Sequence, residues 1–257
     1  MNPVAVIGHV FLNFLASVGD LALFAGQAIS QGLRGPWYPR MILRQMVDIG
    51  YYSLPVVGLT AIFTGMVLAL QSHTGFARFE AQSAVATIVV LSMTRELGPV
   101  LAGLMVAGRV GASMAAEIGT MRVTEQIDAL TTLSTDPFKY LVWPRLIAGL
   151  FMLPLLVIVA DVIGVFGGYL IGIYKLDFGP YDYLHRTFEY LEPQDVISGL
   201  VKAAVFGFLV ALMGCYQGYR SRGGAQGVGA ATTKAVVSAS ILILTSNYLV
   251  TQMFFSQ

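Results

Sequence analysis

Five long stretches of apolar residues, separated by shorter polar segments, dominate the pattern along this chain. They cover residues 47–70, 84–110, 146–174, 196–216 and 235–255. Each reaches the ~20 residues that an α-helix needs to cross the hydrocarbon core of a bilayer. Prolines inside them, such as Pro99 and Pro154, are tolerated in membrane helices. The pattern predicts an all-α integral membrane protein with about five transmembrane helices.

Residues 4–31 form a sixth apolar stretch that differs from the other five. Its polar residues recur at spacings of three, four and seven, which places them in one stripe along a helix. They are His9, Asn13, Ser17, Asp20, Gln27 and Gln31. A single polar stripe is typical of a helix that lies in the membrane interface. We expect an interfacial helix here, with a sixth transmembrane helix as the alternative.

Basic residues between the apolar stretches predict the orientation of the chain. Nine lysines and arginines fall within 34–44, 111–145 and 217–234, against three in the alternate loops. Because basic residues are enriched in cytoplasmic loops, we expect those segments inside and residues 71–83 and 175–195 outside. We expect residues 1–257 to form a single domain, with an N-terminal interfacial region over 1–44 and a transmembrane bundle over 45–257.

Composition agrees with a membrane protein and excludes several other classes. Hydrophobic residues make up 56% of the chain and charged residues 11%, whereas soluble domains are about a quarter charged. The net charge of +1 provides no field that would attract nucleic acid. A single cysteine and three widely separated histidines offer no metal cluster. No G-x-x-x-x-G-K-S/T loop occurs, so we expect no cofactor bound by this chain.

Small residues recur every four positions within the predicted spans. The ladders are Gly103, Ala107, Gly111, Ala115 and Gly119; Gly164, Gly168 and Gly172; and Ala61, Gly65 and Ala69. Small side chains let membrane helices approach one another closely. These faces pack either within one chain, which is the more common case, or between subunits. Five spans are few to enclose a transport pathway, which favours a homodimer.

Charged residues lie inside the predicted spans, where an isolated charge costs at least ~2.5 kcal/mol. They are Arg95, Glu96, Asp161 and Lys202, with Arg109 near the end of its span. Arg95 and Glu96 are adjacent and point to different sides of a helix, so each needs its own neighbour. Lys202 is a candidate partner for Glu96. Such a pair either fixes helix packing or takes part in substrate handling.

The segment 117–133, between the second and third spans, is rich in helix formers and precedes a stop at Asp136 and Pro137. Its apolar side includes Ile127 and Leu130. Other sides carry charges, and the charged residues are Glu117, Arg122, Glu125 and Asp128. A short amphipathic helix at this place is either a solvated connector or a docking element for a cytoplasmic partner.

Four strings of this sequence resemble the MlaE family of ABC permeases. They are SLPVVGLTAIFTGMVLALQ at 53–71, RELGPVLAGLMVAGRVGASMAAEIGTMRVTEQIDAL at 95–130, DPFKYLVWPRLIA at 136–148 and GVGAATTKAVVSA at 227–239. The resemblance runs from about position 44 to the C-terminus. One position departs from the family, whose last span often carries an acid in a string like S-D-Y. Here Asn247 keeps the shape and the hydrogen bonding of that acid but not its charge.

The resemblance implies a permease of the bacterial inner membrane that works as a homodimer. Its partners would be cytoplasmic ATPase subunits, which hold ATP and Mg²⁺, and a periplasmic protein with MCE domains. The substrate would be phospholipid, moved between the inner and outer membranes to maintain the lipid asymmetry of the outer membrane. The helix within 117–133 would dock on the ATPase. Charged residues matching Arg95, Glu96 and Lys202 would lie near a lipid cavity.

Two other functions stay open on the residues alone. A membrane-embedded enzyme acting on lipid would use His73, Glu96 and Asp161, which form no known catalytic spacing. An ion-coupled carrier would use Arg95, Glu96 and Lys202 as a relay, although such carriers usually show internal repeats. Co-purification of an ATPase subunit would favour the permease over both.

Overall fold

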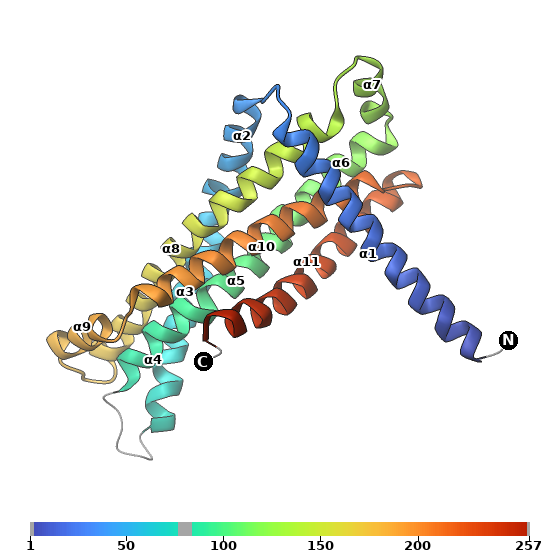
Figure 1. The fold of residues 1–257 in the computed structure, drawn as a ribbon. Coiled ribbons are helices and arrows are strands. Elements are labelled where there is room, and N and C mark those ends of the chain that lie inside the picture. Colours follow the sequence, from blue (N-terminus) through green and yellow to red (C-terminus); the bar gives the residue numbers. More distant parts are fainter. Residues whose placement is uncertain (1–2, 77–83, 256–257) are drawn as a thin grey trace.

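The computed structural model describes residues 3–76 and 84–255, and these residues fold into helices joined by short connections (Figure 1). The helices of the first half are α1 (Pro3–Leu33), α2 (Pro39–Ile49), η1 (Tyr51–Ser53), α3 (Leu54–Phe76), α4 (Val85–Ser92), η4 (Met93–Leu97), α5 (Gly98–Val106), η5 (Ala107–Gly111) and α6 (Ala112–Val123). The helices of the second half are α7 (Gln126–Thr132), η6 (Phe138–Val142), α8 (Trp143–Tyr174), α9 (Pro180–Glu189), α10 (Pro193–Tyr219) and α11 (Gly224–Phe255). The predicted all-α class is confirmed.

Six helical stretches of the described chain are long and apolar enough to cross a membrane. They are Phe11–Leu33, Pro39–Phe76, Val85–Val123, Phe138–Tyr174, Pro193–Tyr219 and Gly224–Phe254. The last five correspond to the five spans that the sequence predicts. The first lies in the stretch that we assigned to the interface. Length and composition fit both placements, so the interfacial position of this helix stays a prediction.

The N-terminal helix α1 is attached to the bundle by its second half. The ring of Phe24 lies 5.1 Å from that of Phe138 and 5.5 Å from that of Tyr216, measured between ring centroids. Asp20 also forms an ion pair with Arg220, with 2.9 Å between Oδ2 and the guanidinium. The first half of α1 runs away from the other helices (Figure 1).

The second predicted span is one long helix with two changes of pitch. Its segments α4, α5 and α6 are joined by π-helical turns over Met93–Leu97 and Ala107–Gly111. A π-helical turn inserts an extra residue and changes which side chains face a neighbouring helix, and such turns are frequent at functional sites. The first turn carries Arg95 and Glu96, and the second carries Arg109. Charged residues of this span therefore lie where the helical register changes.

Glycines of the predicted ladders lie where helices of this one chain meet. A Cβ on Gly65 of α3 would overlap the carbonyl oxygen of Gly164 on α8. A Cβ on Gly168 would lie 2.6 Å from Val89, and one on Gly103 would lie 3.2 Å from Phe206. Two other ladder positions, Ala107 and Gly111, are also buried. The close approaches join α3 to α8, α8 to α4, and α5 to α10.

Two predicted boundaries near the ends of the bundle differ from the structure. The last helix begins at Gly224 rather than at position 235, because the small residues of this segment pack on α6, where a Cβ on Gly119 would lie 3.4 Å from Val228. The predicted cytoplasmic segment 217–234 is therefore mostly helix. The predicted outer segment 71–83 is helical to Phe76, and Arg78 lies outside the described residues.

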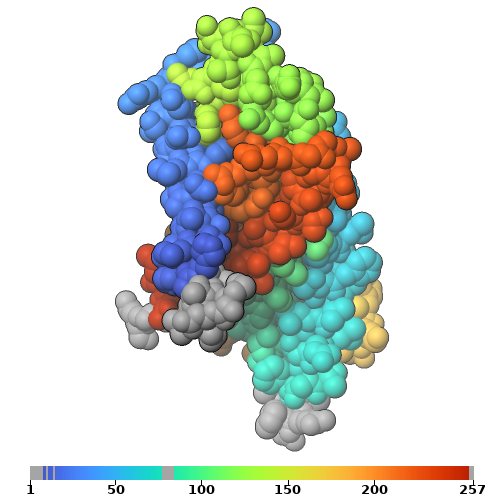
Figure 2. Space-filling model, turned by 90° about the vertical axis from the view of Figure 1, so that its right-hand side faces the viewer, coloured from blue at the N-terminus to red at the C-terminus, as the bar shows by residue number. Residues whose placement is uncertain are grey.

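Helices α7 and α9 lie at opposite ends of the bundle (Figure 1). In the space-filling view, the segment around α7 forms one extremity of the molecule (Figure 2). This arrangement agrees with the orientation inferred from basic residues, which places the α7 segment and the α9 segment on different sides of the membrane.

Candidate functional site

The carboxylate of Glu96 is the centre of a polar cluster between η4, α10 and α11. Its Oε1 lies 2.6 Å from the ammonium of Lys202. The Asn247 amide donates to Oε2 at 2.8 Å, and the Thr251 hydroxyl donates to Oε1 at 2.9 Å. The predicted pairing of Glu96 with Lys202 is confirmed. We call Glu96, Lys202, Asn247 and Thr251 the Glu96 cluster.

Pro99 explains why the lysine fits at this place. A proline has no N–H, so the carbonyl four residues earlier, that of Arg95, lacks its usual helical donor. The Lys202 ammonium donates to that carbonyl oxygen at 2.7 Å. One turn before Lys202, a Cβ on Gly199 would overlap the carbonyl oxygen of Thr94, so glycine lets α10 approach η4 closely. The fully buried Lys202 therefore binds both a carboxylate and a freed backbone carbonyl.

Arg95 has a different partner, as its adjacency to Glu96 predicts. Its Nε lies 2.6 Å from Oδ1 of Asp195, a carboxylate that is only 1% exposed. The other oxygen of Asp195 accepts from the backbone N–H of Glu192 at 3.1 Å, which caps the start of α10. The same carboxylate therefore fixes the N-terminus of α10 and holds Arg95 against it.

The Glu96 cluster reaches the surface of the chain. The Glu96 side chain remains 39% exposed, although Lys202 behind it is fully buried. The exposed residues on the same helix as Asn247 include four large apolar ones, Val237, Ile241, Leu244 and Tyr248. The side-chain oxygen Oδ1 of Asn247 is buried and has no hydrogen-bond partner among the described residues. The arrangement presents a charge-balanced polar spot beside an apolar surface.

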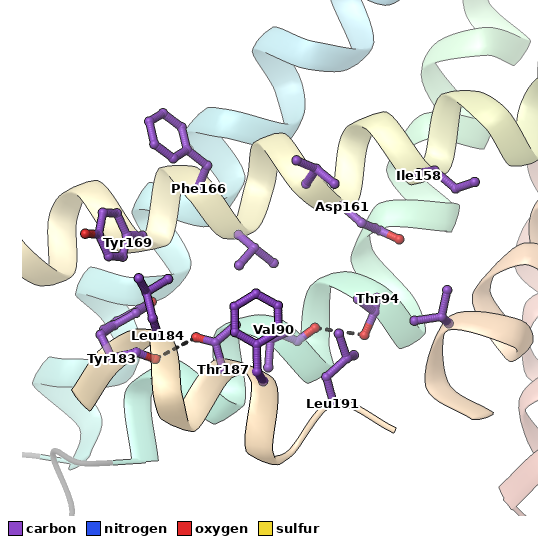
Figure 3. Close-up of a pocket in the computed structure, with 14 residues that line it drawn as sticks. Val90, Thr94, Ile158, Asp161, Phe166, Tyr169, Tyr183, Leu184, Thr187 and Leu191 are labelled. Atoms are coloured by element: carbon purple, nitrogen blue, oxygen red, sulfur yellow. Dashed lines mark hydrogen bonds between the residues drawn. The ribbon is translucent and has the colours of Figure 1, made fainter. Parts of the chain in front are cut away.

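A second feature of the membrane region is an apolar groove between α8, α9 and the α4–η4 segment (Figure 3). Its volume is about 490 Å³. Asp161 lines it from α8, and one carboxylate oxygen, Oδ1, has no hydrogen-bond partner among the described residues. Tyr183 lines it from α9, where burial raises the pKa of its phenol to about 12.

Residues that the enzyme alternative would need do not share one environment. The Glu96 carboxylate bonds to Lys202, whereas Asp161 lines the groove of Figure 3. His73 packs its ring against Phe178, with 5.8 Å between the centroids. Among the described residues, no group of three His, Cys, Asp or Glu side chains is placed to hold a metal ion.

The predicted docking helix within 117–133 is divided in two. Helix α6 continues to Val123, and α7 begins at Gln126. Between them Glu125 adopts a left-handed conformation with φ of 60°, which interrupts the helix. Glu117 therefore belongs to the end of the spanning helix, where it pairs with the buried Arg145 at 2.7 Å.

One residue assigned to the docking surface is buried instead. Ile127 is 1% exposed and packs in the core of this chain, so its side chain is not available to a groove on a partner. Leu130 is partly buried against the same core, whereas Leu133 is 75% exposed. Arg122 and Asp128 pair with each other at 2.7 Å on the surface.

Sequence reasoning missed two members of this site. Thr251 lies one helical turn after Asn247, and a polar residue four positions along an apolar span was a usable signal. Asp195 falls in a loop rich in acids, so nothing in the sequence distinguished it as the partner of Arg95.

Comparisons with known proteins agree with this architecture. The family model described as "Permease MlaE" matches residues 42–253. A Rickettsia felis protein named "Probable ABC transporter permease protein" is 62% identical over 255 residues, which cover 99% of this chain and 98% of that protein.

Two more distant relatives carry more specific names. The "Intermembrane phospholipid transport system permease protein MlaE" of Haemophilus influenzae is 32% identical over 259 residues, 99% of this chain and 98% of its own length. The chloroplast "Protein TRIGALACTOSYLDIACYLGLYCEROL 1" of Arabidopsis thaliana is 36% identical over 239 residues, 92% of this chain and 67% of that protein. This multi-pass membrane protein therefore belongs to the MlaE permease family and is an ABC transporter permease subunit, which has no ATPase activity of its own.

Proposed function

We propose that this permease moves phospholipids between the inner and outer membranes of a bacterium and so maintains outer-membrane lipid asymmetry. Its single permease domain acts in the inner membrane as one subunit of a homodimer. The Haemophilus influenzae relative named for intermembrane phospholipid transport supports this substrate. The observation that carries the proposal is the Glu96 cluster, a polar site on membrane-spanning helices beside the apolar surface of α11.

The chemistry of the cluster suits a phospholipid, which has a polar head and apolar tails. Lys202 balances the charge of Glu96, and Asn247 and Thr251 add hydrogen bonds without adding charge. A head group at this place would meet dipoles and a partly exposed carboxylate rather than bare hydrocarbon, which lowers the cost of placing polar groups in the membrane. The acyl chains would lie on the exposed apolar residues of α11.

We propose that a second copy of the chain covers the exposed face of α11. Val237, Ile241, Leu244 and Tyr248 are spaced by three or four positions, so they form one stripe along the helix. This stripe lies beside Asn247 on α11. Two copies facing each other through α11 would enclose their Glu96 clusters in a shared cavity.

The power source in this proposal is a cytoplasmic ATPase partner, which would hold ATP and Mg²⁺. The segment around α7 is the proposed docking element, because it stands at one extremity of the bundle (Figure 2). It carries the exposed ion pair of Arg122, at the end of α6, with Asp128 on α7, and the exposed Leu133 directly after α7. A periplasmic protein with MCE domains would receive or deliver lipid at the opposite end, near α9.

Reconstitution tests the whole proposal. The permease, its ATPase and its MCE-domain partner are placed in vesicles with fluorescent phospholipid, and transfer to acceptor vesicles is measured with and without ATP. We expect transfer that requires ATP and is lost with Glu96→Gln. Transfer that does not require ATP but stops when an ion gradient is dissipated would support the carrier alternative. Conversion of the lipid to a new product would support the enzyme alternative.

A further inference from the structure

Helix α2 exposes a basic and apolar face that has no protein partner among the described residues. One side of α2 is buried against α8 through Gln45 and Ile49. The opposite side presents Arg40, Leu43, Arg44 and Val47, spaced by three or four positions as one face of a helix requires. Leu43 is 61% exposed and Val47 is 50% exposed.

The charge of this face is of one sign. Between positions 34 and 47 the chain has three arginines, Arg34, Arg40 and Arg44, and no acidic residue. All three are exposed, and none forms an ion pair within the described part of the chain. The next acid, Asp48, lines a cavity together with Arg109 and the buried Gln45 of α2.

Exposed aromatic side chains flank helix α2 at both ends. Trp37 precedes α2 and is 64% exposed, and Tyr51 and Tyr52 follow it with similar exposure. The segment that carries Trp37 is held in place, because Lys139 donates to the carbonyl of Gly35 at 3.1 Å and Tyr38 packs on Tyr140. Exposed tryptophan and tyrosine are typical of the level of the lipid head groups.

We propose that the face formed by Arg34, Trp37, Arg40, Leu43, Arg44 and Val47 binds anionic phospholipid head groups in the cytoplasmic leaflet. Arginine binds phosphate through its fork of N–H donors, and basic clusters beside a membrane attract anionic lipids. Leu43 and Val47 interleave with the arginines and enter the acyl region, which distinguishes a lipid surface from an acidic protein as the occupant. This face lies at the α7 end of the bundle, whereas η4 with the Glu96 cluster lies beyond it toward α9 (Figure 1).

The binding site is separate from the transport site, and its test does not depend on what the transporter carries. The chain has two tryptophans, Trp37 and Trp143. Replacing Trp143→Phe leaves Trp37 as the only tryptophan, placed on the proposed face. The protein is reconstituted in phosphatidylcholine vesicles in which a fixed fraction of the lipid is brominated, either as phosphatidylglycerol or as phosphatidylcholine. Bromine quenches tryptophan fluorescence at short range, so quenching reports which lipid lies beside Trp37.

We expect brominated phosphatidylglycerol to be enriched about fivefold over brominated phosphatidylcholine at low salt, and the preference to shrink as salt is added. Arg40→Gln with Arg44→Gln should abolish the preference, whereas Arg40→Lys with Arg44→Lys should retain most of it. Arg222→Gln with Lys234→Gln is the matched control, because these exposed cations lie on the connection to α11 and on α11 itself, away from α2. This control should leave the preference unchanged.

Three results would overturn the proposal. One is equal quenching by the two brominated lipids in the Trp143→Phe protein. Another is a preference that survives in the Arg40→Gln, Arg44→Gln protein while its size-exclusion profile matches that of the control. The third is loss of ATPase binding by that variant with an unchanged lipid preference, which would assign the face to a protein partner.

Discussion

The ammonium of Lys202 donates to the backbone carbonyl oxygen of Arg95, 2.7 Å away, on another helix. Pro99 leaves this carbonyl without its helical N–H donor, so a side chain completes the backbone bonding of η4. The same ammonium neutralises Glu96 at 2.6 Å. The backbone break and the charge pair therefore depend on each other.

Removing either charge of this pair should damage the protein more than removing both. Lys202→Met leaves Glu96 without its counter-charge, and Glu96→Gln leaves a fully buried ammonium. We expect a coupling energy of about 1–3 kcal/mol in the double variant. Thermal unfolding in detergent measures how each variant changes the stability, and phospholipid transfer between vesicles measures how it changes transport. Strictly additive effects on unfolding would show that the pair does not contribute to stability.

Replacing Pro99→Ala should weaken transport through the backbone. The new N–H competes with Lys202 for the carbonyl of Arg95 and favours a regular helical turn in place of the π-helical one. We expect the protein to fold but to lose a large part of its phospholipid transfer. Pro154→Ala is the control, since this proline lies in α8 and not beside the Glu96 cluster. Equal transfer by the Pro99 variant and the wild type would contradict this role.

The crossing of α3 and α8 should not accept a methyl group. Gly65→Ala would place a Cβ against the carbonyl oxygen of Gly164, so the helices must move apart. We expect the free energy of unfolding to fall by about 1–3 kcal/mol, as for other overpacked contacts. Gly58→Ala on the same helix is the control, because its Cβ would meet only Ile163 at an ordinary 3.4 Å. A Gly65→Ala protein that unfolds at the same temperature as the Gly58→Ala protein would count against this close contact.

Charge reversals on α7 should release the ATPase if this helix is the docking element. The exposed Arg122–Asp128 pair is worth at most about 1 kcal/mol to folding, so Asp128→Lys should leave the permease folded. A lost interfacial charge contact costs about 2–5 kcal/mol in binding, which a pull-down detects. The double variant Arg122→Asp, Asp128→Arg restores the ion pair within the chain. If this variant binds the ATPase, the single reversals acted by changing the shape of the segment; if it does not, the two charges contact the ATPase directly. If variants with reversed charges at Arg122, Glu125 and Asp128 all bind the ATPase as well as the wild type does, the α7 segment is not the docking element.

The orientation of the chain can be tested with single cysteines in a Cys215→Ser background. An impermeant thiol reagent should label a cysteine at Tyr181 in intact spheroplasts but not one at Thr131, because basic residues assign α7 to the cytoplasm. Tyr181 is the better outer position, since it is 78% exposed whereas Tyr183 is buried. A cysteine at Ser83, a residue outside the described ranges, would probe the other predicted outer segment. Labelling at Thr131 alone would reverse the topology.

The sequence by itself determined the features that depend on local composition. A segment of about 20 apolar residues is long enough to cross a membrane as a helix in any fold, so five spans were predictable from hydropathy alone. Adjacent charges on a helix must face different partners, which predicted separate neighbours for Arg95 and Glu96. The strings between positions 53 and 239 indicated the family, and the match of the family model over residues 42–253 confirms it.

Only the tertiary structure decided which distant residues meet. Thr251 and Glu96 are 155 positions apart, and Asp195 and Arg95 are 100 apart, so no local pattern joins them. The burial of Ile127 could not be predicted for the same reason. An amphipathic pattern shows that Ile127 needs an apolar neighbour but not whether that neighbour belongs to this chain or to another. Its burial is set by how α7 folds back after the left-handed turn at Glu125, which depends on packing between helices.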